Sequence, residues 1–292
     1  MENNNLVLLK KNGWLLIKNF FDSDYCDNLR ESCYKSSTSG LDGKDLLSNN
    51  NLNFLFFNEK LMALLTDLIG EKPVYFGDSS YQIASINGGI ATGFHKDCID
   101  RNNPKGLDWD KDYSLIRIGI YLQDHKNYSE GLIVRTNSHH TNDLNKGKKI
   151  NVPSEKGDLI IWYLTTTHSG NAKRLKGTDA NLFMNDSLKK NILGKIYYKV
   201  LYKFVQPSQK DRVALFATFG KNDVHLDRII KYLKHRSYMV SSWKNENYNS
   251  DILKKIKQQN LLEVREMKIE VDSIDTENFV EYNFVDFKKF NI

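Results

Sequence analysis

Two histidines and one aspartate are spaced as the ligands of a single metal ion would be. His95 and Asp97 stand two apart in an extended segment, residues 92–97, and alternate residues of an extended chain point to the same side. His168 follows a turn and an apolar run at residues 156–163, so a neighbouring strand would supply the third ligand. Two imidazoles and one carboxylate leave positions on the ion open, which is the ligand set of non-haem Fe(II) oxygenases.

A His-x-Asp pair with a distant histidine arises by chance in many chains, so the flanking residues carry the argument. Five blocks follow one another in order: GWLLIKNFF at 13–21, GFHKD at 93–97, IRIGIYLQDH at 116–125, SEGLIVRTNSH at 129–139 and KGD at 156–158. As a set they resemble the phytanoyl-CoA dioxygenase family over residues 13–220. Glu130 and Asn137 stand where the family has glycines.

The resemblance implies a double-stranded β-helix, a jelly-roll relative of the cupins, with the triad holding Fe(II) and with 2-oxoglutarate and O2 as co-substrates. It also implies an arginine for the far carboxylate of 2-oxoglutarate, since a guanidinium donates two parallel hydrogen bonds to a carboxylate. Arg212 and Arg174 compete for this role. We choose Arg212, which opens the strand-like run 212–220. It lies 44 residues beyond His168, so residues 171–211 must loop out.

Two further polar residues lie on strand-like runs. Gln82 precedes the metal motif and is a candidate to hydrogen-bond the co-substrate or the substrate, with an ordinary surface position as the alternative. Arg117 lies in an apolar run, where a charge needs a partner. It either points into the mouth of the core or pairs with Asp124.

Short apolar or alternating runs, separated by turn residues, predict a core of β-strands. They lie at 13–20, 74–76, 81–86, 114–122, 132–135, 158–163 and 212–219. Such a series indicates an all-β sandwich or barrel with added helices. Helical spacing predicts helices at 22–36, 56–69, 224–235 and 250–266. We expect one oxygenase domain over residues 1–292, with its core at 74–220, a helical insertion at 171–211 and a C-terminal helical extension at 221–292.

The insertion carries a basic amphipathic pattern at residues 188–205, where apolar residues recur at helical spacing with five lysines between them. The favoured interpretation is a helix that packs its apolar stripe onto the core. The alternatives are a lid over the site or a helix that meets a lipid surface.

Composition describes a globular chain, with 40% hydrophobic and 27% charged residues. Three cysteines form neither a disulfide framework nor a metal-finger pattern. No apolar run would cross a bilayer and the start lacks signal-peptide features, so a cytoplasmic location is expected. The net charge of +6 is taken as mild and spread along the chain. It favours anionic partners in general, and no nucleic acid is expected.

These observations predict an iron- and 2-oxoglutarate-dependent dioxygenase that hydroxylates an unactivated C–H bond of a small metabolite, releasing succinate and CO2. Asp97 favours hydroxylation, because a halogenase needs a small residue there to admit chloride. Lys96 and the lysines of the insertion favour an anionic, lipid-linked or glycan-linked substrate. A non-catalytic cupin-like binding protein and a nucleic-acid oxygenase are the alternatives, and the oligomeric state stays open.

Overall fold

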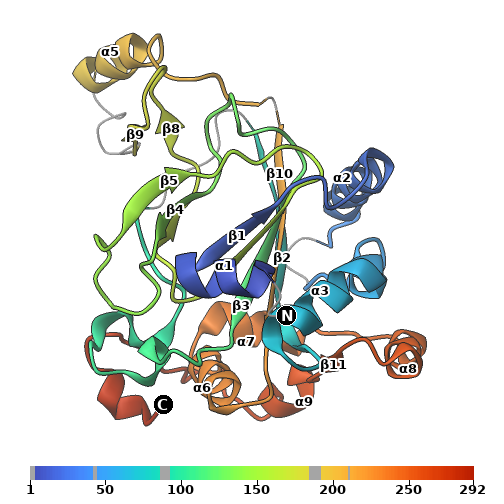
Figure 1. Ribbon diagram of the computed structural model, residues 1–292. Coiled ribbons are helices and arrows are strands. Elements are labelled where there is room, and N and C mark those ends of the chain that lie inside the picture. Colours follow the sequence, from blue (N-terminus) through green and yellow to red (C-terminus); the bar gives the residue numbers. More distant parts are fainter. Residues whose placement is uncertain (1–3, 42–44, 86–92, 184–191, 210) are drawn as a thin grey trace.

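Two β-sheets face each other at the centre of the molecule (Figure 1). The computed structural model describes residues 4–41, 45–85, 93–183, 192–209 and 211–292. The larger sheet has the order β1-β6-β3-β10-β2-β11, and the smaller one β5-β4-β7. In that order the strands are β1 (Trp14–Ile17), β6 (Leu159–Tyr163), β3 (Ile116–Tyr121), β10 (Asp211–Gly220), β2 (Val74–Ser85), β11 (Glu263–Val264), then β5 (Lys148–Asn151), β4 (Ile133–Thr136) and β7 (His168–Ser169).

Both faces of the larger sheet are covered, and successive residues of its strands point to opposite faces. On β3, Ile118 and Ile120 join the main hydrophobic core under the helices. Tyr121 of the same strand and Trp162 of β6 belong to a smaller core shared with Val134 of the opposite sheet. The space between the two sheets is therefore where inward-pointing polar residues of β2, β3 and β10 meet.

The expected strands at 114–122, 132–135, 158–163 and 212–219 are confirmed as β3, β4, β6 and β10. The strands expected at 74–76 and 81–86 are one strand, β2, and residue 86 lies outside the described residues. Residues 77–80, expected to separate two strands, belong to β2. Gly77 has a φ of 72°, which accompanies a shift in the pairing with β10 between Ala217 and Phe219. A β-bulge, which keeps the strand continuous, explains both observations.

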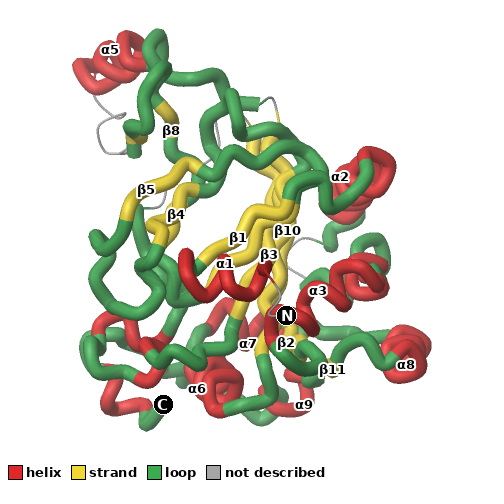
Figure 2. The backbone as a smooth tube through the Cα atoms, viewed as in Figure 1, coloured by secondary structure: helices red, strands yellow, loops and turns green. Residues whose placement is uncertain are grey.

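Helices cover the outer face of the larger sheet (Figure 2). The two expected near the start are α2 (Ser23–Thr38), capped by Asp22, and α3 (Glu59–Ile69), which ends at Gly70 with φ of 84°. The helix expected at 224–235 is α6 (Val224–Leu233), and that at 250–266 is the shorter α8 (Ser250–Gln259). α8 ends early because Asn260 turns the chain with φ of 53° and β11 then pairs with β2.

Several helices were not expected from periodicity. They are α1 (Asn4–Asn12), α7 (Ser237–Lys244), α9 (Met267–Val271) and the short 3-10 turns η1 (Asn53–Phe57), η2 (Ile99–Asn102), η3 (Leu107–Trp109) and η4 (Phe287–Phe290). Each is short, so few apolar positions recur within it and the pattern stays weak. Among the described residues, no helix is both long and apolar enough to cross a bilayer.

The insertion stands out from the rest of the molecule (Figure 1). It comprises the hairpin of β8 (Lys173–Arg174) and β9 (Asn181–Leu182), and α5 (Ile192–Leu201). The favoured expectation that its helix packs an apolar stripe onto the core is wrong, because Ile192, Leu193 and Ile196 are 76%, 79% and 55% exposed. Residues 188–191 of the expected helix lie outside the described residues.

Candidate metal centre

The structure brings His95, Asp97 and His168 together, with one potential ligand atom from each within 4.8 Å of the others. Nε2 of His168 lies 3.4 Å from Asp97 Oδ2, and Nε2 of His95 lies 3.7 Å from Asp97 Oδ1. His168 comes from β7, whereas the other two residues come from the segment that follows β2. The donors are two imidazole nitrogens and a carboxylate, which suit a first-row divalent metal such as Fe(II).

Backbone pairing places the two histidines beside each other. His95 and His168 exchange two backbone hydrogen bonds, each 3.0 Å long, and the Asp97 amide donates to the Leu164 carbonyl at 2.9 Å. The Nδ1 atoms face backbone carbonyls, that of Gly93 for His95 and that of Thr166 for His168. A proton on Nδ1 satisfies such a contact and leaves the Nε2 lone pair available, which is how metal-binding histidines are usually oriented.

The protonation states of His168 and Asp97 favour binding of a cation. Burial lowers the pKa of His168 to about 4, so its imidazole is neutral at neutral pH. Burial opposes ionisation of Asp97, but the neighbouring His168 and Arg117 outweigh it and hold the pKa of this carboxyl below its ordinary value. His168 therefore offers a neutral nitrogen and Asp97 a negative charge.

Arg117 connects the centre to the larger sheet, and sequence reasoning missed both of its acidic partners. It donates to Asp97 Oδ2 at 2.9 Å and to Asp78 Oδ2 at 2.7 Å. The expected alternative, an ion pair between Arg117 and Asp124, is wrong. The described partner of the Asp124 carboxylate is the backbone amide of Lys156. The sequence did indicate that Arg117 needs a partner, because it is a charged residue in an apolar run. It could not indicate that Asp78 is one, because Asp78 lies next to the bulge at Gly77, which was not expected.

A cavity of about 240 Å³ opens beside the triad. Arg212 and Gln82 lie in its lining together with the three residues of the triad. The remaining lining residues are Ser80, Arg117, Tyr121, Leu132, Trp162, Gly170, Asn171 and Phe216. Arg212 is only 4% exposed, donates through Nε to the Glu130 carbonyl at 3.0 Å, and contacts Gln82 Oε1 at 3.4 Å. A buried guanidinium that faces a cavity is suited to bind a carboxylate there.

Arg174, the competing candidate, lies elsewhere. Its side chain turns into its own hairpin, where it contacts the Thr178 carbonyl and Asp179, and it does not line the cavity of the triad. Arg212 reaches that cavity because the insertion does loop out. The chain returns through a backbone bond from Gln206 to Arg174 of 2.7 Å, and β10 then enters the sheet between β3 and β2.

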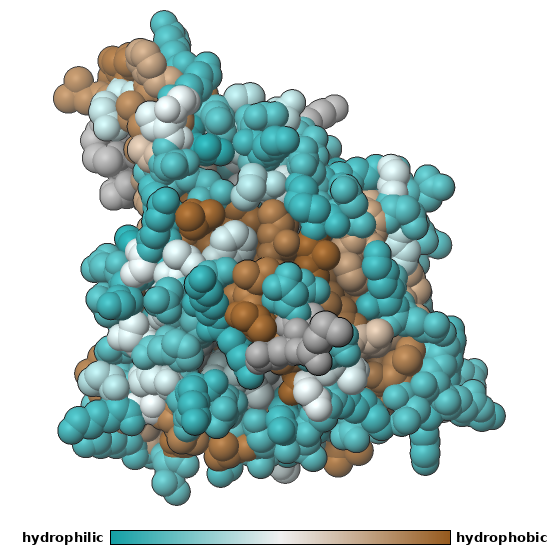
Figure 3. Space-filling view, viewed as in Figure 1, coloured by the Kyte–Doolittle hydropathy of each residue, from teal (hydrophilic) through white to brown (hydrophobic). Residues whose placement is uncertain are grey.

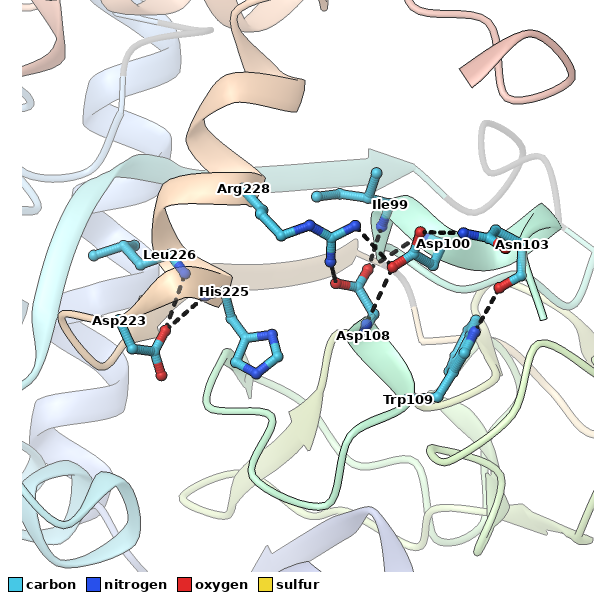
Figure 4. A network of polar contacts seen from close by, with 9 residues as sticks. All are labelled: Ile99, Asp100, Asn103, Asp108, Trp109, Asp223, His225, Leu226 and Arg228. Carbon is cyan, nitrogen blue, oxygen red and sulfur yellow. Dashed lines mark hydrogen bonds and ion pairs between the residues drawn. The ribbon is translucent and has the colours of Figure 1, made fainter. Parts of the chain in front are cut away.

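The loop after Asp97 is held by a buried ionic network (Figure 4). Arg228 of α6 donates to Asp108 at 2.7 Å and to Asp100 at 2.9 Å, and both carboxylates are buried. Asp108 in turn accepts the backbone amides of Ile99 and Asp100. Asp223 caps α6 by accepting two of its first amides. A C-terminal helix therefore anchors the loop that continues from the metal ligands.

Lys96 does not face the cavity. Its side chain is fully buried, and Nζ donates to the carbonyls of Ser138 and Thr165 at 2.7 and 2.6 Å. Burial lowers the pKa of this amine to about 8. Lys96 therefore ties the ligand segment to two turns, and using it as a sign of an anionic substrate is wrong.

Comparisons with known proteins show the fold. No protein-family model matches the chain, and no curated protein matches its sequence. Solved structures do match. The nickel complex of ThoJ, a non-heme monooxygenase, is 12% identical with a TM-score of 0.52, covering 75% of this chain and 77% of that one. EctD from S. alaskensis, solved with 2-oxoglutarate and 5-hydroxyectoine, is 11% identical with a TM-score of 0.52, covering 75% and 76%.

A third solved structure is the epimerase SnoN in complex with Fe3+, alpha ketoglutarate and nogalamycin RO. It is 13% identical to this chain with a TM-score of 0.50, covering 74% of this chain and 82% of the other. At these identities the likeness is one of architecture. It confirms the expected fold class, a cupin-type β core with added helices.

Proposed function

We propose that this chain is a non-haem Fe(II)- and 2-oxoglutarate-dependent oxygenase that hydroxylates an unactivated C–H bond. The overall reaction takes R–H, O2 and 2-oxoglutarate to R–OH, succinate and CO2. The observation that carries the proposal is a single cavity lined by His95, Asp97 and His168 and also by the buried Arg212. A metal with open positions beside a carboxylate-binding cation is what a chelating dicarboxylate requires.

The metal-binding and charged residues of the cavity each have a part in this proposal. The triad holds Fe(II), and the metal with its bound 2-oxoglutarate supplies the oxidising chemistry. Arg212 receives the far carboxylate of 2-oxoglutarate, with Gln82 and the Glu130 carbonyl directing the guanidinium. Arg117 keeps the Asp97 carboxylate in place.

Three apolar side chains form a further part of the cavity wall. Trp162, Phe216 and Leu132 lie in the lining, and their surfaces exclude water from the reacting groups. The substrate is proposed to be a small molecule, in keeping with the nogalamycin and 5-hydroxyectoine complexes of structures that share the fold. The ordered blocks of residues 13–158 support membership of the phytanoyl-CoA dioxygenase family. We also propose that the substrate is anionic or lipid-linked. The lysines of the insertion are the only support for this part of the proposal.

The test is an anaerobic titration of the purified protein with Fe(II) and 2-oxoglutarate, followed by the visible charge-transfer band of the chelate. We expect a band with the wild type and none with His168→Ala. Arg174→Lys is the matched control, because it alters an arginine outside the cavity and should leave the band intact. Admitting O2 should then release succinate. A folded wild-type protein that binds metal and gives no band would support the non-catalytic binding protein instead.

A further inference from the structure

An apolar surface is exposed on the insertion, remote from the cores of the molecule. The apolar residues of α5 form a stripe at Ile192, Ile196 and Val200, each more than half exposed, with Leu193 beside it. Phe204, just beyond the helix, is 61% exposed. Figure 3 shows these brown side chains gathered on the projecting part of the molecule where α5 lies. An exposed apolar patch of this kind indicates a surface that binds a protein, a ligand or a membrane.

The same segment accounts for the excess of positive over negative charge in the sequence. Residues 187–210 contain six lysines and no acidic residue. The whole chain has 42 Lys and Arg against 36 Asp and Glu, so the chain without this segment has 36 of each. The expectation that the excess charge is spread along the chain is therefore wrong. Within the described part, Lys195, Lys199 and Lys203 recur every fourth residue beside the apolar stripe.

We propose that α5 and the residues after it, 192–204, form a docking surface for an anionic lipid bilayer. Helices that lie in a membrane interface combine an apolar face with lysines that meet acidic headgroups. Tyr197 and Tyr202, which are 54% and 47% exposed, have the amphipathic rings that favour the headgroup level. A second copy of the chain suits this surface less well, because pairing the segments would bring two sets of lysines together.

Backbone and side-chain contacts connect the base of the insertion to the wall of the cavity. Leu175 and Val205 form a β-bridge, and Lys173 reaches back to Glu130 at 2.5 Å. The Glu130 carbonyl is the group that accepts from Arg212. The docking proposal itself does not depend on the iron chemistry, and binding is measured without turnover.

The experiment is co-sedimentation of the full chain with vesicles of equimolar phosphatidylcholine and phosphatidylglycerol. We expect wild-type protein to sediment with these vesicles, to bind less as salt is raised, and to stay in solution with pure phosphatidylcholine. Lys195→Glu/Lys199→Glu should weaken binding about tenfold or more, since each lysine near such a surface contributes about 1 kcal/mol. Leu193→Asp/Ile196→Asp should abolish it.

Matched control variants change the same chemistry on other surfaces. Lys254→Glu/Lys257→Glu makes the same charge change on α8, and Ile269→Asp introduces an acid at a residue that is 76% exposed. Both should retain near wild-type binding. Wild-type protein that ignores the acidic vesicles, or controls that lose as much binding as the α5 variants, would overturn the proposal. Sedimentation showing a dimer that Leu193→Asp/Ile196→Asp dissociates, without vesicle binding, would assign the surface to a second copy.

Membrane docking and oxygenase activity can be tested separately. Circular dichroism and the Fe(II)–2-oxoglutarate band report on fold and metal site in the α5 variants, and both should equal those of the wild type. Vesicle binding with no chelate band would support membrane docking and contradict the proposed oxygenase activity. A chelate band without vesicle binding would support the oxygenase activity and contradict docking.

Discussion

Arg117 is the residue through which the metal centre depends on the larger sheet. Its guanidinium lies between Asp78 on β2 and Asp97 of the triad, and Nε donates to Thr218 on β10 at 3.0 Å. Burial acts to lower the pKa of Arg117, but the two carboxylates together outweigh it and hold this pKa above its ordinary value. The cation therefore stays charged and holds one Asp97 oxygen, so the carboxylate cannot rotate freely.

Arg117→Gln should lower Fe(II) affinity about 10- to 100-fold, the usual cost of losing a group that orients a metal ligand. The measurement is the Fe(II) concentration needed to develop the 2-oxoglutarate chelate band. Asp78→Asn is the matched variant, because it breaks the other half of the ion pair and leaves Asp97 with its partner. Equal losses in the two variants would mean that Arg117 acts through general stability rather than through Asp97.

Arg212 and Arg174 can be separated by the affinity for 2-oxoglutarate. Arg212→Lys replaces a planar fork by a single ammonium group, so we expect about tenfold weaker 2-oxoglutarate binding or more, with Fe(II) binding alone unchanged. Arg174→Lys should change neither. The band is titrated with 2-oxoglutarate at saturating Fe(II). A larger effect from Arg174→Lys than from Arg212→Lys would reverse the assignment.

Elements with strong periodicity or clear caps could be predicted from the sequence, whereas those set by distant partners could not. The apolar runs of β3, β6 and β10 predicted buried strands, and helical spacing over residues 22–36 predicted α2. The bulge at Gly77 could not be predicted, because it depends on packing against Trp243 of α7, whose ring nitrogen donates to the Gly77 carbonyl. Periodicity gave the amphipathic pattern of α5 and could not say whether the apolar stripe would be covered.

The same limit applied to the site. The triad could be located because His95 and Asp97 lie in one recognisable block and His168 follows the strand that another block opens. Arg212 could be located because it opens a strand. The prediction for Lys96 was wrong, because a residue between two metal ligands need not point toward the metal. Successive residues of an extended segment point to opposite sides, so Lys96 points away from the ligands. Its carbonyl partners, Ser138 and Thr165, are brought near only by the folded sheets.

At the scale of elements, α6 and the loop after Asp97 depend on one another through Arg228. Arg228→Met leaves Asp100 and Asp108, which are 3% and 2% exposed, without their cation. Removing one partner of a buried ionic group typically costs about 3–5 kcal/mol. Urea unfolding should show this loss in the free energy of unfolding. Arg228→Lys, which retains the charge but not the fork, should lose less, and equal losses would contradict a role for the charge.

The end of α7 should make stability depend on pH. Burial and the nearby charge of Asp45 raise the pKa of Glu246 from 4.5 to about 8. A group with a raised native pKa contributes stability that is complete below its unfolded pKa and is lost as the pH rises through its native pKa. Wild-type stability should therefore fall between pH 4.5 and about 8.

Glu246→Gln removes this titration and keeps an oxygen that accepts the backbone amide of Lys268. Relative to wild type, the variant should gain about 2–4 kcal/mol above pH 8, and this gain should vanish at low pH. Urea unfolding at a series of pH values gives both curves. Parallel curves across the range would show that another group sets the pH dependence.

At the scale of the whole molecule, the proposed ligands are held between parts that are far apart in the chain. The triad belongs to the smaller sheet and the segments around it, whereas Gln82 and Arg212 belong to β2 and β10 of the larger sheet. A metal with its chelated co-substrate would therefore join the two sheets across their smaller core. Ligands that bind only the folded state raise its stability by an amount that grows with the logarithm of the free ligand concentration relative to Kd.

Thermal unfolding should reveal this coupling. At about 100 times Kd, Mn(II) with 2-oxoglutarate should add about 3 kcal/mol and raise Tm by about 5–10 °C; Mn(II) is used because it accepts the same donors without oxygen chemistry. His168→Ala should abolish the response to both ligands. Arg212→Gln should retain the metal increment and lose most of that from 2-oxoglutarate. A 2-oxoglutarate shift that survives Arg212→Gln in full would mean that the larger sheet does not hold the co-substrate, and that the two sheets are not joined through it.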